Sequence, residues 1–291
     1  MKRGSVEVVV EAQNILGEGA LWSVDEQRLY WTDIEARQLY RLDPETPGVM
    51  TWPTPERACS FAFREKGGLL VAFESGLSFF DLSSRREVRI VDVETDLPAT
   101  RLNDGRCDRQ GRFVVGGFDA SGKGGSGAYR LDRDLSLHEL FRGLSSANST
   151  CFSLDGRTMY YADTPKGAIW AFDYEIEIGT PRDRRVFYDF GDQPGAPDGS
   201  AIDSEGCLWN AQWSGSRVVR FTPEGRIDQI IEMPCSNPTS VAFGGHNLDT
   251  LFITSARFLL TEDQIRREPL SGALFAVRPG VQGMPETTFR A

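Results

Sequence analysis

PDGSAIDSEGCLWNAQW, residues 197–213, contains a polar residue, a short apolar run, a tight turn and a second apolar run, in that order. Asp198 precedes the turn glycine, Gly206, by eight residues. The same spacing recurs at four other places in the chain, and Glu18 keeps the register without the glycine. Six equivalent positions follow: Glu18, Cys59, Asn103, Asn148, Asp198 and Asn237.

These six positions mark a repeat. They lie 41, 44, 45, 50 and 39 residues apart, a period of the size expected for four-stranded propeller blades. Glycine-rich turns separate short apolar segments throughout, and TEDQIRREPL, residues 261–270, is the only segment that favours a helix. The pattern therefore predicts an all-β chain that folds as a six-bladed β-propeller.

The sixth repeat is one strand short, because few residues follow GALFAV, residues 272–277, and Pro and Gly interrupt them. The N-terminal segment VEVVVEA, residues 6–12, is a strand to spare. We expect it to pair as the outer strand of the sixth blade and to close a single propeller domain of residues 1–291, which removes exposed sheet edges. In a propeller the innermost strands begin on one face near the axis, so the six positions should face one another.

Composition excludes several classes of protein. No apolar run approaches the roughly 20 residues that span a bilayer, and the N-terminus alternates Val with Glu, so we expect no membrane contact, no signal peptide and a cytoplasmic location. The five scattered cysteines argue against both a disulfide framework and a structural zinc site. The net charge of −10 disfavours nucleic acid as a partner.

Three of the equivalent positions carry the oxygen atoms that hard metal ions prefer. Glu18, Asn148 and Asp198 offer two carboxylates and an amide, a set suited to Ca²⁺, Mg²⁺, Mn²⁺ or another divalent cation. Two carboxylates balance one such charge, whereas without it they would repel each other. The alternative is that Asn103, Asn148 and Asp198 are turn or strand-end residues that bond local backbone groups, as Asn and Asp often do.

Other polar residues would lie beside this site. Arg101 and Asn103 could hold ligand hydroxyls or a carboxylate, although a salt bridge to a loop acid is an equal alternative for Arg101. We interpret Asp104 as structural and Cys59 as a small apolar filler. The two histidines, His138 and His246, fall in an outer strand and a turn, so a Ser-His-Asp triad and histidine-based zinc or iron sites lack parts.

Longer blocks give a family resemblance over nearly the whole chain. LGEGALW around Glu18, RLNDG from Arg101, ANSTCFSLDGRTMYYAD around Asn148 and PDGSAIDSEGCLWNAQW around Asp198 resemble, in order, blocks of the gluconolactonase, senescence marker protein and luciferin-regenerating enzyme family. The resemblance implies a six-bladed propeller with one divalent metal on Glu18, Asn148 and Asp198, and a substrate-holding pair at Arg101 and Asn103. It also implies Asp119 as a substrate-binding candidate. ANST departs from the commoner PNG of the family.

The resemblance further implies an enzyme that hydrolyses a pentono- or hexonolactone to its aldonic acid. The cofactor would be one divalent cation, Ca²⁺, Zn²⁺, Mn²⁺, Mg²⁺ or Fe²⁺, and Asp198 would also act as the general base. Two alternatives stay open. One is a non-catalytic metal-binding or interaction propeller, and the other is a metal-dependent esterase or phosphotriesterase. The sugar, the metal and the oligomeric state are not specified by the sequence.

Overall fold

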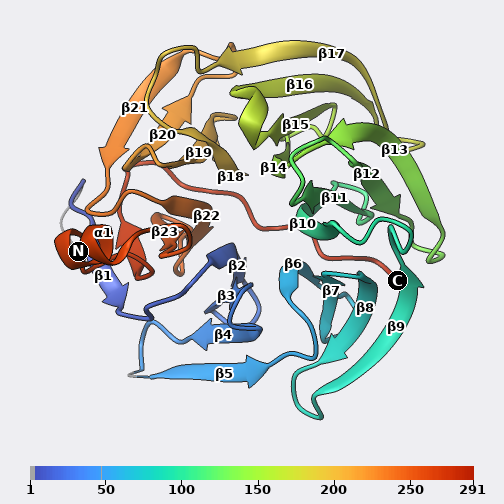
Figure 1. The fold of residues 1–291 in the computed structure, drawn as a ribbon, viewed down its shortest axis with the longest axis horizontal. Coiled ribbons are helices and arrows are strands. Elements are labelled where there is room, and N and C mark those ends of the chain that lie inside the picture. Colours follow the sequence, from blue (N-terminus) through green and yellow to red (C-terminus); the bar gives the residue numbers. More distant parts are fainter. Residues whose placement is uncertain (1–3, 47) are drawn as a thin grey trace. The chain divides into compact units, whose positions relative to one another are not determined.

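The computed structural model describes residues 4–46 and 48–291, and these residues form six four-stranded antiparallel sheets (Figure 1). Each sheet is one blade of a six-bladed β-propeller, which confirms the predicted all-β class. The described residues contain one α-helix, α1 (Glu262–Arg267), inside the segment predicted to be helical, and one 3-10 turn at Thr164–Lys166. Neither has the length and apolar character needed to cross a bilayer.

The chain divides into two compact units, and each unit holds three of the sheets. The first unit contains residues 1–54 and 190–285, and the second contains residues 55–189 and 286–291. The assignment of residues 1–291 to a single domain stays a prediction.

Three sheets make up the first unit. One consists of β2 (Gly17–Ser23), β3 (Arg28–Asp33), β4 (Gln38–Leu42) and β5 (Val49–Pro53). Another consists of β18 (Ala196–Ile202), β19 (Leu208–Trp213), β20 (Arg217–Phe221) and β21 (Ile227–Glu232). The third is ordered β22 (Pro238–Gly244), β23 (Thr250–Ser255), β24 (Leu274–Val277) and β1 (Glu7–Val10).

The N-terminal strand completes the sixth blade, as the sequence predicts. Strand β1 pairs antiparallel with β24, with Glu7 opposite Ala276 and Val8 opposite Phe275. The sixth blade therefore takes its outer strand from the opposite end of the chain. Within this unit β22 contacts both β2 and β18, and Figure 1 shows it between them.

Three more sheets make up the second unit. One consists of β6 (Ala58–Phe63), β7 (Leu69–Phe73), β8 (Gly76–Asp81) and β9 (Arg86–Asp92). The next consists of β10 (Thr100–Cys107), β11 (Phe113–Asp119), β12 (Ser126–Leu131) and β13 (Leu137–Leu144). The last consists of β14 (Ala147–Phe152), β15 (Thr158–Asp163), β16 (Ala168–Glu175) and β17 (Thr180–Asp189). Strand β10 contacts both β6 and β14.

The last six residues, 286–291, belong to the second unit and help to build its core. Phe289 is fully buried and packs in the same apolar cluster as Phe113 and Tyr129. Its backbone forms a bridge with Arg64, and Glu286 forms an ion pair with Arg106. The sequence predicts only a broken tail here, because a single aromatic residue gives no periodic signal.

Candidate functional site

The six equivalent residues lie at the beginnings of the innermost strands. Five of them fall within the first four residues of their strand rather than before it, and Asn237 directly precedes β22. Each innermost strand also shifts register at this point. The shifts lie at Glu18/Leu21, Ala58/Ser60, Leu102/Gly105, Asn148/Cys151, Pro197/Ser200 and Pro238/Val241. Bulges of this kind bend a strand and re-aim its side chains, and they are common beside active sites.

Glu18 and Asp198 both belong to the first unit. They lie on β2 and β18, the two strands that contact β22. Asp198 is buried, and its carbonyl oxygen accepts a hydrogen bond of 2.9 Å from the Asn210 amide. Oε2 of Glu18 accepts the backbone N–H of Gly19, whose φ of 60° turns the strand at the bulge. Two carboxylates thus lie on strands that pack against the same neighbour.

Asn237, the sixth equivalent residue, is used locally. Its Oδ1 accepts hydrogen bonds from the Ser214 backbone and hydroxyl, and its Nδ2 donates to the Phe258 carbonyl. These bonds join the loops before β22 and after β23. The interpretation of such residues as local backbone partners therefore holds at this position.

Arg101 and Asn103 lie close together in the second unit. Nη1 of Arg101 donates to Oδ1 of Asn103 at 2.6 Å, and Nδ2 of Asn103 donates to the Ala147 carbonyl at 2.8 Å. The Arg101 guanidinium lies 4.6 Å from the centre of the Phe118 ring. In the described residues no acidic side chain pairs with Arg101, so the salt bridge weighed as its alternative role is absent.

Cys59 is buried beside Arg101, with its sulfur 3.8 Å from Nη1. Burial raises the pKa of this thiol to about 11, although the Arg101 charge lowers it. A protonated thiol is a poor nucleophile. The interpretation of Cys59 as a small apolar filler fits these contacts, and all five cysteines are free.

Thr164 orients the Asn148 side chain in the second unit. Nδ2 of Asn148 donates to the Thr164 hydroxyl at 2.8 Å, so the amide oxygen Oδ1 is the remaining acceptor of this side chain. Two residues later, the Thr150 backbone N–H donates to Oδ2 of Asp104 at 2.7 Å and so ties the Asn148 bulge to β10. Burial raises the pKa of Asp104, and the Arg106 charge and the Thr150 bond oppose that rise. Asp104 is thus structural, as the sequence analysis interprets it.

Ser149 lies in ANST, the segment that departs from the PNG expected from the family resemblance. Its φ is 57°, the left-handed conformation that a glycine would adopt without cost. We expect the free energy of unfolding of Ser149→Gly to exceed that of Ser149→Ala by about 1 kcal/mol. Both variants lack the hydroxyl, so the comparison isolates the methyl group and the backbone conformations that it permits. Urea unfolding of the pair measures this, and equal stabilities would contradict it.

Asp119 holds the loop that follows β11. Its Oδ1 accepts the Ser121 N–H and its Oδ2 accepts the Gly125 N–H, both at 2.8 Å. Hydrogen bonds from Ser121 and from the Gly125 amide lower the pKa of Asp119 to about 2. The carboxylate therefore fixes the glycine-rich segment 122–125, and its direct contact with substrate stays a prediction.

The donor chemistry suits a hard divalent cation. The described residues contain no group of three or more His, Cys, Asp or Glu side chains that could hold a metal. The predicted set has two carboxylates and one amide, which are oxygen donors of the kind that Ca²⁺ and Mg²⁺ accept. His138 lies in the outer strand β13 and His246 in the turn before β23, as expected. A histidine-rich zinc site is therefore not built here.

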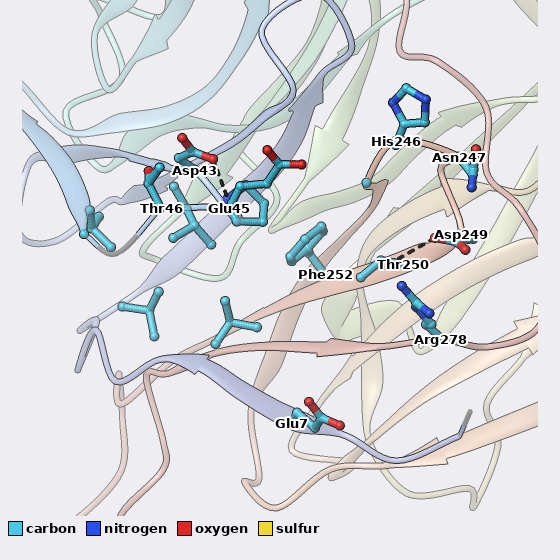
Figure 2. A pocket seen from close by; sticks show the side chains of 17 residues that line it. Glu7, Asp43, Glu45, Thr46, His246, Asn247, Asp249, Thr250, Phe252 and Arg278 are labelled. Atoms are coloured by element: carbon cyan, nitrogen blue, oxygen red, sulfur yellow. Dashed lines mark hydrogen bonds between the residues drawn. The ribbon is translucent and has the colours of Figure 1, made fainter. Parts of the chain in front are cut away.

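A groove of about 870 Å³ opens elsewhere in the first unit, and Figure 2 shows the side chains that line it. It lies between β1, the β4–β5 turn and the β22–β23 turn, and none of the predicted site residues lines it. Asp43 on its rim is paired with Arg28 at 2.7 Å, and Asp249 accepts a bond from Thr250. Size alone therefore does not make this groove the reaction site.

Comparisons with known proteins agree with the motif order. The family model described as SMP-30/Gluconolactonase/LRE-like region matches residues 16–257. The chain is 38% identical to 6-deoxy-6-sulfogluconolactonase of Pseudomonas putida over 98% of both chains. It is 40% identical to L-arabinolactonase of Azospirillum brasilense, over 98% of this chain and 96% of the relative. The structure of the calcium-binding protein regucalcin from Agrobacterium tumefaciens superimposes with a TM-score of 0.95 at 29% identity, over 99% of this chain and 98% of the other.

Proposed function

The chain belongs to the SMP-30/Gluconolactonase/LRE-like family, and on that premise we propose that it is a lactonase that hydrolyses a sugar lactone to the aldonic acid. One observation carries the proposal. Glu18, Asn148 and Asp198 all lie at the bulges of three innermost strands, where the register shifts between Glu18 and Leu21, between Asn148 and Cys151, and between Pro197 and Ser200. Relatives of nearly the same length carry lactonase names, for five-carbon and six-carbon sugars, which supports a pentono- or hexonolactone as substrate.

Metal dependence is part of the proposal. Glu18, Asn148 and Asp198 would hold one divalent cation, through two carboxylates and the amide oxygen that the Thr164 bond leaves for a ligand. The calcium-binding description of the regucalcin structure supports this assignment. When bound, the cation would polarise the lactone carbonyl, which is worth several kcal/mol of transition-state stabilisation.

The side chains of this protein account for the remaining steps. Asp198 would accept a proton from the attacking water while the water oxygen bonds to the carbonyl carbon. The ring C–O bond then breaks, and the proton passes to the departing ring oxygen. Arg101 and Asn103 would hold substrate hydroxyls, and their mutual hydrogen bond orients both groups in advance. Asp119 would act by fixing the loop after β11.

Chelation should abolish lactone hydrolysis, and one or more of Ca²⁺, Zn²⁺, Mn²⁺, Mg²⁺ and Fe²⁺ should restore it. The reason is that the two carboxylates alone cannot polarise the carbonyl. A pH indicator measures acid release from a panel of pentono- and hexonolactones before EDTA, after EDTA and after addition of each cation, against the spontaneous rate.

Three outcomes would count against this reading. Full activity after EDTA would refute metal dependence. Cation binding without turnover of any lactone would favour a non-catalytic binding propeller. Turnover confined to aryl esters or phosphotriesters in the same panel would replace the sugar lactone with the third class of substrate.

A further inference from the structure

We propose that Thr239 is a positioning residue that sets the separation between Glu18 and Asp198. The inference rests on the proposed function, in which these two carboxylates share a cation. Thr239 is the second residue of β22, the strand that contacts both β2 and β18 (Figure 1). All three strands lie in the first unit.

On one side Thr239 contacts the strand that carries Glu18. Its hydroxyl donates a hydrogen bond to the carbonyl oxygen of Gly17, the residue before Glu18. The Thr254 hydroxyl lies 2.9 Å from the Thr239 hydroxyl and also accepts the Ser240 N–H at 3.1 Å. Both threonine side chains are buried, so no bulk water can replace these bonds. The hydroxyl pair thus fixes where β2 begins relative to β22.

On the other side the same stretch of β22 contacts the strand that carries Asp198. Gly199, the residue after Asp198, lies directly against the backbone of Thr239 and Ser240. A Cβ atom at residue 199 would come within 2.9 Å of the Thr239 carbonyl oxygen and of the Ser240 Cα. The glycine therefore allows a backbone-to-backbone approach that no larger residue permits.

These two contacts define a fixed span. Gly17 hydrogen-bonds to the side chain of Thr239, and Gly199 packs against its main chain. Glu18 and Asp198 are each one residue away from those contacts. The register shifts at Glu18 and at Pro197 begin beside the same two points, so neither strand can slide without losing one of them. Partners outside the ligand shell that orient ligands in this way often matter nearly as much as the ligands themselves.

A matched pair of substitutions tests the proposal. Thr239→Val keeps the shape and removes the hydroxyl, whereas Thr239→Ser keeps the hydroxyl and removes the methyl group. We expect Thr239→Val to weaken Ca²⁺ binding, measured by titration calorimetry on the full chain, by about 10- to 100-fold. The Ca²⁺ affinity of Thr239→Ser should stay within about threefold of that of the parent protein, because serine keeps the hydroxyl. A threefold change corresponds to less than about 1 kcal/mol. The kcat/KM for the lactone should fall in the same order.

Two results would overturn it: a folded Thr239→Val protein that binds Ca²⁺ as the parent does, or equal losses in Thr239→Val and Thr239→Ser. If Thr239→Val does not fold, Gly199→Ala takes its place, because the added Cβ should push β18 away from β22. Unchanged Ca²⁺ affinity of Gly199→Ala would then count against the proposal.

If the parent protein binds no divalent cation, the proposed function fails by itself. Crystal structures of the two Thr239 variants then test the positioning role alone, since only Thr239→Val should change the distance between the Cα atoms of Glu18 and Asp198.

Discussion

Alanine in place of Asp198 should lower kcat/KM for the preferred lactone by at least roughly a thousandfold. The substitution removes the proposed general base and one of two anionic ligands, and together these supply several kcal/mol of transition-state stabilisation. A loss of about 4 kcal/mol corresponds to a factor of 10³ at 25 °C. Asp198 is buried on β18, and a water molecule in its place would carry no negative charge to act as base or to balance the cation. Initial rates from the pH indicator measure the loss.

Two companions separate the roles of Asp198. Asp198→Asn keeps an oxygen ligand and cannot accept the proton, so it should bind Ca²⁺ more tightly than Asp198→Ala and still turn over little substrate. Asp25→Ala removes an exposed carboxylate from the β2–β3 turn and should leave the rate unchanged. Circular dichroism shows whether each variant is folded. If Asp198→Ala is folded and keeps near-normal lactonase activity, Asp198 is neither the general base nor an essential metal ligand.

The strands and their grouping could be predicted because their signals are local. A turn glycine eight residues after five of the six equivalent positions marks the hairpin, and the period of 39 to 50 residues groups four strands into a blade. The pairing of the N-terminal strand with β24 followed from counting strands. Such signals need only neighbours in the sequence, and they placed all six equivalent residues at the starts of innermost strands.

The remaining features depend on contacts between distant residues. The hydrogen bond from Thr239 to Gly17 joins residues 222 positions apart, and neither a threonine nor a glycine at these positions predicts it. The residue after Glu18 and the residue after Asn148 both have a positive φ. Gly19 indicates this conformation in the sequence, whereas Ser149 does not, because serine seldom adopts it. The two loop amides that the Asp119 carboxylate bonds are also not specified by the sequence, and its contact with substrate stays a prediction.

Alanine in place of Asp203 should destabilise the protein by about 3 to 5 kcal/mol, the range observed when one partner of a buried ion pair is removed. The Asp203 side chain is 0% exposed, and Oδ2 accepts hydrogen bonds of 2.8 Å from the Trp209 indole and from Nε of Arg220. Its Oδ1 accepts the Glu205 and Cys207 amides, which forms the turn between β18 and β19. Burial works against the charge of Arg220, yet the hydrogen bonds that it donates to three carboxylates raise its pKa above the usual range. The variant would leave Nε of Arg220 and the indole N–H of Trp209 without an acceptor in the core, while Glu205 and Asp228 would still pair with the guanidinium.

Asp228 provides the matched control, because it binds the same guanidinium from the surface. Its carboxylate lies 2.5 Å from Nη1 of Arg220, and its side chain is 41% exposed. Exposed ion pairs contribute about 0 to 1 kcal/mol, so Asp228→Ala should shift the urea midpoint little. The comparison holds the arginine constant and contrasts a buried carboxylate that also bonds the turn amides and the indole with an exposed one. Equal shifts of the urea midpoint for Asp203→Ala and Asp228→Ala, with unchanged m-values, would mean that the stability of the turn between β18 and β19 does not depend on the buried carboxylate.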